Sequence, residues 1–293
     1  MKPLSAYLDT ADLDAHIQRS LHEDLGNGPG AGDHSSNAAL PEGVQGCAEL
    51  KAKQALCFAG RDVADCVLRA VSPDLSATWF AEDGDRLNPG QVAAEVRGPL
   101  RALLGAERTL LNYVQRLSGV ATQTQRYADQ IADLPCTLLD TRKTTPGWRM
   151  LEKWAVQVGG ARNHRVGLHD MVMLKDNHVD LAGGISEAVR RTETYLAERG
   201  LDRAIEVECR SLDDVREALA LPGVDRIMLD NFTPAQCRAA VALNAGQKEL
   251  EASGGITLET LRSFAETGVQ FISVGALTHS APAVDLNFKA RRI

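Results

Sequence analysis

The sequence has few aromatic residues, no paired cysteine motif and no long apolar run. Phe, Trp and Tyr make up 4% of the 293 residues, so the stacking side chains typical of single-stranded nucleic-acid binding are scarce. No run approaches the roughly 20 apolar residues of a membrane span, and the opening MKPLSAYLDTADLD has acids where a signal peptide is apolar. The six cysteines form no CxxC, a usage typical of reduced thiols. We therefore expect a cytoplasmic protein that binds neither membrane nor nucleic acid.

Positive charge is concentrated in one segment of an otherwise acidic chain. The formal net charge is −7, whereas the stretch from Arg142 to His178 has seven Lys and Arg against three acids, a local charge of +4. Clustered like charges repel one another unless an anion neutralises them. A basic surface patch or a nucleic-acid groove is the alternative, but nucleic-acid domains usually have a basic overall balance. The segment therefore predicts a pocket for a small polyanion that carries carboxylates, phosphates or both.

Short β-prone apolar runs alternate with helix-like stretches after residue 120. The runs are TLLD, MVMLK, AIEVE, RIMLD, LEASGG and FISVGA, and the late ones recur every 22 residues, at 208, 230, 252 and 274. Ser211 with Asp214, and Thr233 before Pro234, are typical helix starts. Regular alternation of this kind predicts a parallel sheet buried on both faces, in a closed or nearly closed α/β barrel.

The strand ends of such a barrel predict where the site lies. In α/β barrels the carboxyl ends of the strands build the active site. On the run AIEVE we expect one of Glu206 and Glu208 to point away from this ring. Two late glycine-containing ends are candidate phosphate loops, with simple turn glycines as the alternative. The polar ring expected from this rule is Asp140, Arg142, Lys143, Lys175, Glu208, Asp230, Ser253, Gly254 and Gly255.

The N-terminal third has a different pattern. An early helix with one apolar face is followed by the loop GNGPGAGD at residues 26–33, which lacks the lysine of a P-loop and is interpreted as a surface loop. Short strands around CAELKAK and VAAEVRG then predict a small α+β domain. An amphipathic helix follows, and we expect it to break near Ser118 and Gly119, at a hinge between two domains.

Seven motifs together resemble a known family. DTRKTTPG, LEKWAVQVGGARNHRVGL, LKDNH, EVEC, MLDN, EASGGI and SVGALTHS occur in the order found in quinolinate phosphoribosyltransferases (nicotinate-nucleotide pyrophosphorylase, carboxylating), of the type II phosphoribosyltransferases. The resemblance covers nearly the whole chain and is dense from residue 107 to 280. It implies an N-terminal α/β sandwich at residues 1–118 and an incomplete, open α/β barrel at 119–280. Residues 281–293 are a candidate to pack back on the first domain.

The resemblance also implies a reaction and a set of site residues. Quinolinate and phosphoribosyl pyrophosphate would give nicotinate mononucleotide, CO2 and pyrophosphate, in de novo NAD biosynthesis. Glu208 and Asp230 would stabilise the cation that develops on the ribose, and Lys143 would act beside the pyrophosphate substrate. The quinolinate carboxylates would be held by Arg108 of the partner subunit, Arg142, His164, Arg165 and Lys175. The 5′-phosphate would be held by Ser253, Gly254, Gly255, Val274, Gly275 and Ala276.

The remaining implications concern metal and assembly. Mg²⁺ would arrive bound to pyrophosphate, near Glu208 and Asp230, so no metal site built wholly by protein is expected. The family forms a homodimer with a shared active site, and a hexamer is left open. Two other functions also stay open. The first is a related type II phosphoribosyltransferase that acts on another aromatic acid. The second is an anion-binding protein without catalysis, but the full set of cations and carboxylates argues against it.

Overall fold

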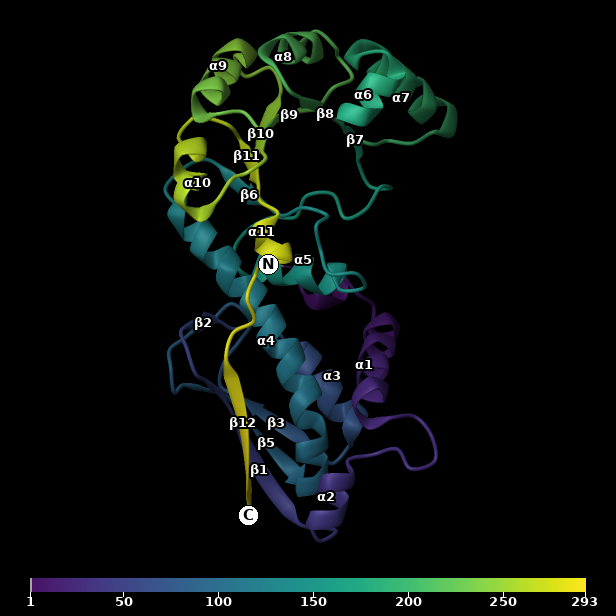
Figure 1. Cartoon of the computed structure of the whole chain (residues 1–293), viewed down its shortest axis with the longest axis vertical. Coiled ribbons are helices and arrows are strands. Elements are labelled where there is room, and N and C mark those ends of the chain that lie inside the picture. The colour runs from purple at the N-terminus through teal and green to yellow at the C-terminus, as the bar shows by residue number, and fades with distance from the viewer. Residues whose placement is uncertain (1) are drawn as a thin grey trace. The chain divides into compact units, whose positions relative to one another are not determined.

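A computed structural model describes residues 2–293, which divide into two compact units. The first unit contains the described residues up to Gln125, together with Met150–Gly160 and Ala281–Ile293. The second unit contains Arg126–Arg149 and Ala161–Ser280. Each unit has its own sheet. In Figure 1 the colour runs along the chain, so the yellow C-terminal strand is seen beside the purple strand of the same unit with which it pairs.

The first unit is built on a four-stranded sheet in the order β12-β1-β5-β3, and all its neighbours are antiparallel. Helix α1 buries Leu13, Ile17 and Leu21, the apolar face expected from the sequence. The expected strands around CAELKAK and VAAEVRG are confirmed as β1 and β5. The elements are η1 (Leu4–Ala6), α1 (Thr10–Leu25), α2 (His34–Ala39), β1 (Gln45–Ala52), β2 (Leu56–Cys57), α3 (Arg61–Val71), β3 (Ser76–Trp79), β4 (Arg86–Leu87), β5 (Val92–Pro99), α4 (Leu100–Gln130), α5 (Arg149–Val158) and β12 (Leu286–Arg292). The last five residues of α4 and the first residue of α5 belong to the second unit.

The expected helix break near Ser118 and Gly119 is wrong. Helix α4 continues through both residues without interruption. The Ser118 hydroxyl accepts a hydrogen bond from the N–H of Ala59 and donates one to the carbonyl of Ala59, at 2.9 and 3.0 Å, so it serves a tertiary contact and not a turn. A Cβ added at Gly119 would lie 2.2 Å from the carbonyl oxygen of Pro282. Glycine is therefore needed there for close packing of the segment before β12 and not as a hinge.

The glycine-rich loop is confirmed as a surface loop. Residues 26–31 are exposed, and residues 32 and 33 are partly exposed. The loop ends at Asp33, whose carboxylate accepts a hydrogen bond from the N–H of Ser36 at 3.0 Å and so caps helix α2. An aspartate at this position satisfies an N–H group that the helix itself leaves unpaired.

The second unit is built on six parallel strands in the order β6-β11-β10-β9-β8-β7. All six apolar runs are confirmed as strands. No pairing joins the two outer strands, β6 and β7, among the described residues, so the barrel is open, as expected. The strands are β6 (Thr137–Leu139), β7 (Val172–Leu174), β8 (Ile205–Cys209), β9 (Arg226–Asp230), β10 (Glu249–Ser253) and β11 (Phe271–Ser273). The helices are α6 (Asp176–Ala182), α7 (Ile185–Arg199), α8 (Leu212–Leu219), α9 (Pro234–Asn244), α10 (Leu258–Ala265) and α11 (Ala276–His279).

The helix starts of this unit follow the sequence signals. Ser211 accepts a hydrogen bond from the N–H of Asp214, whose carboxylate accepts one from the N–H of Ser211. Thr233 begins α9 in the same way, with proline in the first turn. Helices α8, α9 and α10 follow the outside of the curved sheet (Figure 1). Since neighbouring strands are parallel, their carboxyl ends meet at one edge, where the expected polar residues gather.

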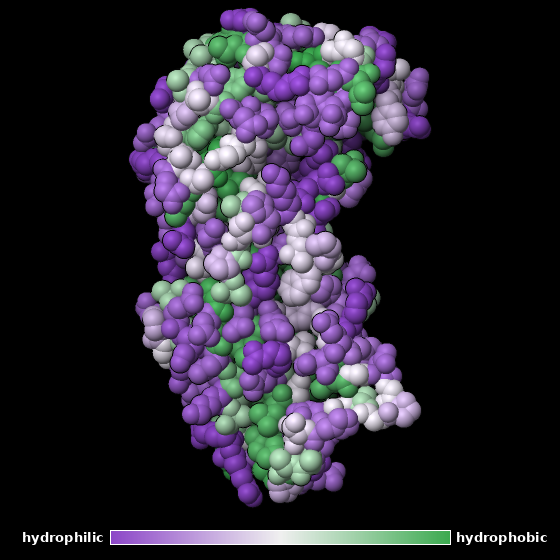
Figure 2. Space-filling model, in the orientation of Figure 1, coloured by the Kyte–Doolittle hydropathy of each residue, from purple (hydrophilic) through white to green (hydrophobic). Residues whose placement is uncertain are grey.

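The molecular surface is mainly polar. Figure 2 shows hydrophilic side chains over most of the visible face, with apolar ones in small islands. Within residues 2–293, no helix is long and apolar enough to cross a membrane.

Candidate active site

The carboxyl ends of the parallel strands border a cavity of about 660 Å³ in the second unit. Of the site residues predicted from the sequence, all but Arg108 and Asp140 line this cavity. These lining residues are Arg142, Lys143, His164, Arg165, Lys175, Glu208, Asp230, Ser253, Gly254, Gly255, Val274, Gly275 and Ala276. Arg108 lies on α4 in the other unit, with its side chain 61% exposed and 3.8 Å from Glu107.

The cavity has an excess of fixed positive charge. Four Lys and Arg side chains line it, against the two carboxylates Glu208 and Asp230. The Nε atom of Arg142 is buried and has no hydrogen-bond partner among the described residues. Burial lowers the pKa of Arg165, and the charge of Arg142 lowers that pKa further. Two guanidinium groups in this setting are stabilised by a bound anion, because planar carboxylates and phosphates accept paired hydrogen bonds from them.

A tight turn after β6 presents Arg142 and Lys143. The N–H of Lys143 donates to the hydroxyl of Thr141 at 3.0 Å. The carbonyl of Lys143 accepts a hydrogen bond from the hydroxyl of Thr278 at 2.7 Å, which ties this turn to helix α11. The cations are therefore fixed through their main chain, and their side chains remain available to a ligand.

Asp140 holds the next basic segment and does not line the cavity. The strand-end rule placed Asp140 in the polar ring, but its side chain is wholly buried. Its carboxylate accepts hydrogen bonds from the main-chain N–H of His164 and the side-chain amide of Asn163, both at 2.8 Å. Arg165 follows directly, and its guanidinium donates to the carbonyl of Met171 at 3.2 Å. Asp140 thus positions basic residues without facing the ligand itself.

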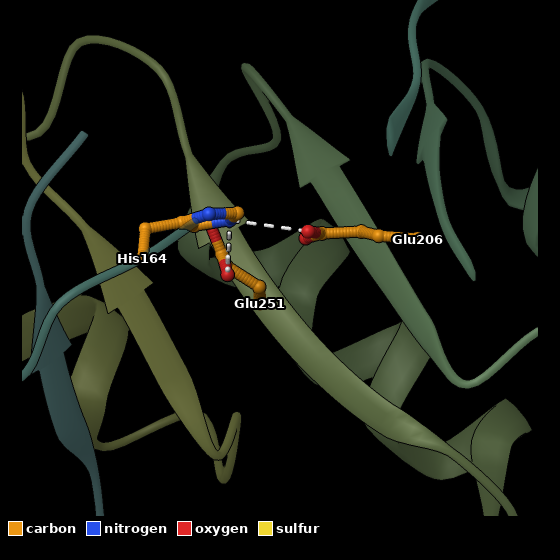
Figure 3. A group of neighbouring side chains, drawn as sticks. All are labelled: His164, Glu206 and Glu251. Carbon is orange, nitrogen blue, oxygen red and sulfur yellow. Dashed lines mark ion pairs between the residues drawn. The ribbon is translucent and has the colours of Figure 1, made fainter. Parts of the chain in front are cut away.

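His164 lies between the cavity and two buried glutamates. Its Nε2 atom is 3.1 Å from a carboxylate oxygen of Glu206 and 3.3 Å from one of Glu251. Its Nδ1 atom accepts a hydrogen bond from the main-chain N–H of Arg165 at 2.6 Å. Burial lowers the pKa of His164, but hydrogen bonds to the two glutamates and their charges outweigh burial and raise it to about 9. Figure 3 shows both carboxylates directed at the imidazole ring.

Of Glu206 and Glu208, only Glu208 belongs to the polar ring, as expected, but the reason is depth and not opposite faces of the strand. Side chains two residues apart in a strand share a face, so both belong to the interior face of β8. They differ in depth. Glu208 lines the cavity at the strand end, whereas Glu206 is wholly buried and does not line it.

The carboxylates at the ends of β8 and β9 have different partners. Glu208 lies 3.5 Å from the ammonium group of Lys175. Asp230 accepts a hydrogen bond at 2.7 Å from the side-chain amide of Asn231, which has a positive φ of 57°. The N–H of Lys175 donates to Nδ1 of His178 at 2.9 Å, which gives His178 a structural role at the start of α6.

The two glycine-containing loops differ in what their main chain offers. Gly254 and Gly255 have φ of +94° and +63°, which side chains disfavour, and a Cβ on Gly254 would lie 2.3 Å from the amide oxygen of Asn231. Neither glycine donates a main-chain hydrogen bond to another main-chain group in the described part of the chain. The N–H of Val274, by contrast, donates to the carbonyl of Leu139 at 3.0 Å. The first loop therefore offers the freer N–H groups for a phosphate.

Sequence reasoning missed several residues of this region. Asn231 and His279 line the cavity, and both fall inside quoted motifs, MLDN and SVGALTHS. Glu251 and Arg226 lie deeper and contact each other at 3.2 Å. The available signal was a charged residue within an apolar strand, since such a residue is seldom buried without a specific partner.

The comparisons with known proteins agree with this geometry. Residues 33–118 match the family model described as the quinolinate phosphoribosyl transferase N-terminal domain, and residues 120–289 match the corresponding C-terminal domain. The chain belongs to the quinolinate phosphoribosyl transferase family. The resemblance inferred from the motifs is thereby confirmed.

Individual relatives are similar over most of their length. A Bacillus subtilis protein named probable nicotinate-nucleotide pyrophosphorylase [carboxylating] is 43% identical, over 88% of this chain and 88% of its own. A rice protein of that name, labelled chloroplastic, is 42% identical over 96% of this chain and 78% of its own. The solved structure of NadC from Streptococcus pyogenes has a TM-score of 0.91 and 37% identity, covering 98% of this chain and 99% of its own.

Proposed function

We propose that this protein converts quinolinate and phosphoribosyl pyrophosphate to nicotinate mononucleotide, CO2 and pyrophosphate, a step of NAD biosynthesis. The observation that carries the proposal is the cavity lined both by Arg142 and Arg165, which lie close together, and by two strand-end carboxylates. Membership of the family supports the same reaction. An anion-binding protein without catalysis would have no need of Glu208 and Asp230 in this cavity.

The cations suit a planar dicarboxylate. Quinolinate carries two adjacent carboxylates on a pyridine ring, and Arg142, Arg165 and Lys175 supply guanidinium and ammonium donors from three separate segments. His164 forms part of the same wall. Donors that converge from several segments hold the ring in one orientation, so its nitrogen faces the anomeric carbon of the second substrate.

Glu208 and Asp230 suit the charge that develops during ribosyl transfer. When pyrophosphate leaves, the ribose acquires oxocarbenium character, and fixed carboxylates stabilise positive charge that exists only at that stage. Lys143 lies beside Gly275, in the position to neutralise phosphate oxygens. Gly254 and Gly255 would bind the 5′-phosphate through main-chain N–H groups. Once the nitrogen carries the ribosyl group it is cationic, so the ring itself accepts the electrons left by CO2, and no acid–base pair is required.

Magnesium fits this arrangement as a partner of pyrophosphate. Glu208 and Asp230 stand at the ends of the neighbouring strands β8 and β9, and carboxylate oxygens are ligands that Mg²⁺ accepts. They would hold the ion together with its water and phosphate ligands. The ion would neutralise the leaving pyrophosphate. We expect a chelator to abolish turnover and added Mg²⁺ to restore it.

The proposal includes a homodimer in the cytoplasm. Arg108 is absent from the cavity lining, and we propose that Arg108 of the partner subunit completes the carboxylate clamp. Relatives from plants are named as chloroplastic or mitochondrial, so compartments differ among relatives.

Release of CO2 tests the reaction. Quinolinate labelled at its 2-carboxylate should release labelled CO2 only when phosphoribosyl pyrophosphate is present, with nicotinate mononucleotide identified by mass spectrometry. Arg165→Ala, prepared identically, controls for contaminating activity. Nicotinate as the alternative substrate separates the proposed enzyme from a phosphoribosyltransferase of different specificity. Release that does not depend on phosphoribosyl pyrophosphate, or turnover of nicotinate alone, would contradict the proposal.

A further inference from the structure

A buried ionic cluster lies directly behind the cavity wall. It consists of His164, Glu206, Glu251 and Arg226, the last of which contacts Glu251 at 3.2 Å. Both glutamate side chains are fully buried, and His164 is 4% exposed. Burying charges is costly unless they pair closely. Branched apolar side chains usually fill this layer of a barrel, so the cluster calls for a specific explanation.

The buried part of the cluster carries excess negative charge. Glu206 and Glu251 supply two carboxylates against one guanidinium, that of Arg226, which the exposed Glu249 also contacts at 2.8 Å. This excess favours one proton beyond the neutral imidazole. Closely coupled groups share such a proton, which belongs to the cluster as a whole. Since Nδ1 of His164 accepts a hydrogen bond from the N–H of Arg165, it carries no proton; the ring proton is on Nε2, and the additional proton is held by the carboxylates that face it.

A metal ion is the competing explanation for the same three side chains. Nitrogen and oxygen atoms of His164, Glu206 and Glu251 lie within 4.8 Å of one another. A metal-bound histidine, however, normally donates the N–H of its other nitrogen to a carbonyl or carboxylate. Here that nitrogen accepts from the N–H of Arg165, the opposite polarity. With Arg226 also beside Glu251, the arrangement favours an ion-paired cluster.

We propose that Glu206 and Glu251 are positioning residues, which hold the His164 ring from behind the cavity and thereby fix Arg165 at the cavity wall. The two carboxylates approach one ring nitrogen from strands β8 and β10, so the ring cannot turn without losing both. The other ring nitrogen binds the main chain of Arg165. This proposal rests on the proposed function, because Arg165 is taken to bind quinolinate.

The charge of the cluster gives the proposal a pH signature. Glu206 on β8 and Glu251 on β10 face the His164 ring. Arg226 on β9 lies beside Glu251 and also pairs with Glu249. Asp140 after β6 accepts from the main-chain N–H of His164, and the main-chain N–H of Arg165 donates to Nδ1. The two glutamates hold the pKa of His164 near 9 against the effect of burial. Removing one glutamate lowers this pKa, so the cluster loses its additional proton within the neutral range. Quinolinate, a dianion, should then bind less tightly as pH rises.

The test compares Glu206→Gln and Glu251→Gln with wild type and with Glu187→Gln, a surface carboxylate that pairs with Arg190 and Arg191. Quinolinate affinity is measured by calorimetry at pH 6, 7 and 8. Both cluster variants should bind about tenfold or more weakly, the effect of losing a hydrogen bond to a charged group. Their affinity should also fall further with pH, by up to about tenfold per pH unit. Wild type and Glu187→Gln should show neither change.

A titration of the His164 ring by NMR, assigned with His164→Gln, separates this role from general destabilisation. In wild type the ring signal should not titrate between pH 6 and 8, and in either cluster variant it should. If Glu251→Gln fails to fold because Arg226 loses this partner, the Glu206→Gln variant alone tests the proposal. Wild-type affinity and pH profile in the folded variants would overturn the proposal. So would a stoichiometric metal in wild type that both variants lack. Wild type without quinolinate binding would instead overturn the proposed function, and the NMR titration would still decide the role of the glutamates.

Discussion

Replacing Arg165 by alanine should weaken quinolinate binding by about 2–5 kcal/mol, the usual cost of removing one partner of a desolvated charge pair. Only 9% of Arg165 is exposed, and burial lowers its pKa, so water does not screen it as on an open surface. An exposed ion pair would contribute only about 0–1 kcal/mol. The expected loss corresponds to a dissociation constant raised roughly 30-fold to several thousandfold. Arg142→Ala should behave similarly, because its buried Nε has no partner among the described residues.

Calorimetry with quinolinate alone measures this loss without turnover. Arg191→Ala is the matched control, since the side chain of Arg191 is 60% exposed and pairs with a surface glutamate, Glu187. Its affinity should equal that of wild type. If both Arg142→Ala and Arg165→Ala bound quinolinate within threefold of wild type, about 0.7 kcal/mol, this cavity would not be the carboxylate site.

Three further outcomes are expected. Glu208→Gln and Asp230→Asn should slow single-turnover chemistry more than they weaken quinolinate binding, and loss confined to affinity would assign them to binding. Gly254→Ala should raise the KM for phosphoribosyl pyrophosphate, because an added Cβ would meet a side-chain oxygen at 2.3 Å; an unchanged KM would exclude this loop as the phosphate site. Mixing Arg108→Ala with Lys175→Ala, each inactive alone, should restore about a quarter of wild-type activity, since half the dimers are mixed and each has one intact site. No recovery, with subunit exchange verified by mass spectrometry, would exclude a shared site.

The architecture of the second unit could be predicted because its signals are local. Each apolar run is short, ends in a polar or small residue, and is followed by a helix start such as Ser211 or Thr233. These signals determine strand, helix and alternation, and alternation determines that neighbouring strands are parallel. The helix break expected at Ser118 and Gly119 was wrong because its signal is not local. Whether a serine and a glycine end a helix depends on distant partners, here Ala59 and Pro282, which the local sequence does not reveal.

The cavity lining could be predicted because strand ends in a parallel barrel share one edge. Knowing the ends of the runs was enough to place Lys175, Glu208 and Asp230 together. The role of Asp140 was not predicted correctly, because a polar side chain at a strand end has two possible orientations. It faces the cavity, or it turns inward to hold the main chain of a neighbouring segment, as Asp140 does with His164. The position of a residue in the sequence does not distinguish these two orientations.

The depth at which a side chain lies within the barrel could not be predicted from the sequence. Residues two apart on a strand share a face, so Glu206 and Glu208 both face the interior, as do Glu251 and Ser253 on β10. The second member of each pair lines the cavity, and the first lies beneath it. Pairing of the strands sets Glu206 beside Arg226 on β9, and Glu251 one strand further on. An ionic layer under a polyanion cavity therefore follows from strand order and register. Its acids, separated by 45 residues in the chain, meet only because β8 and β10 flank the same strand.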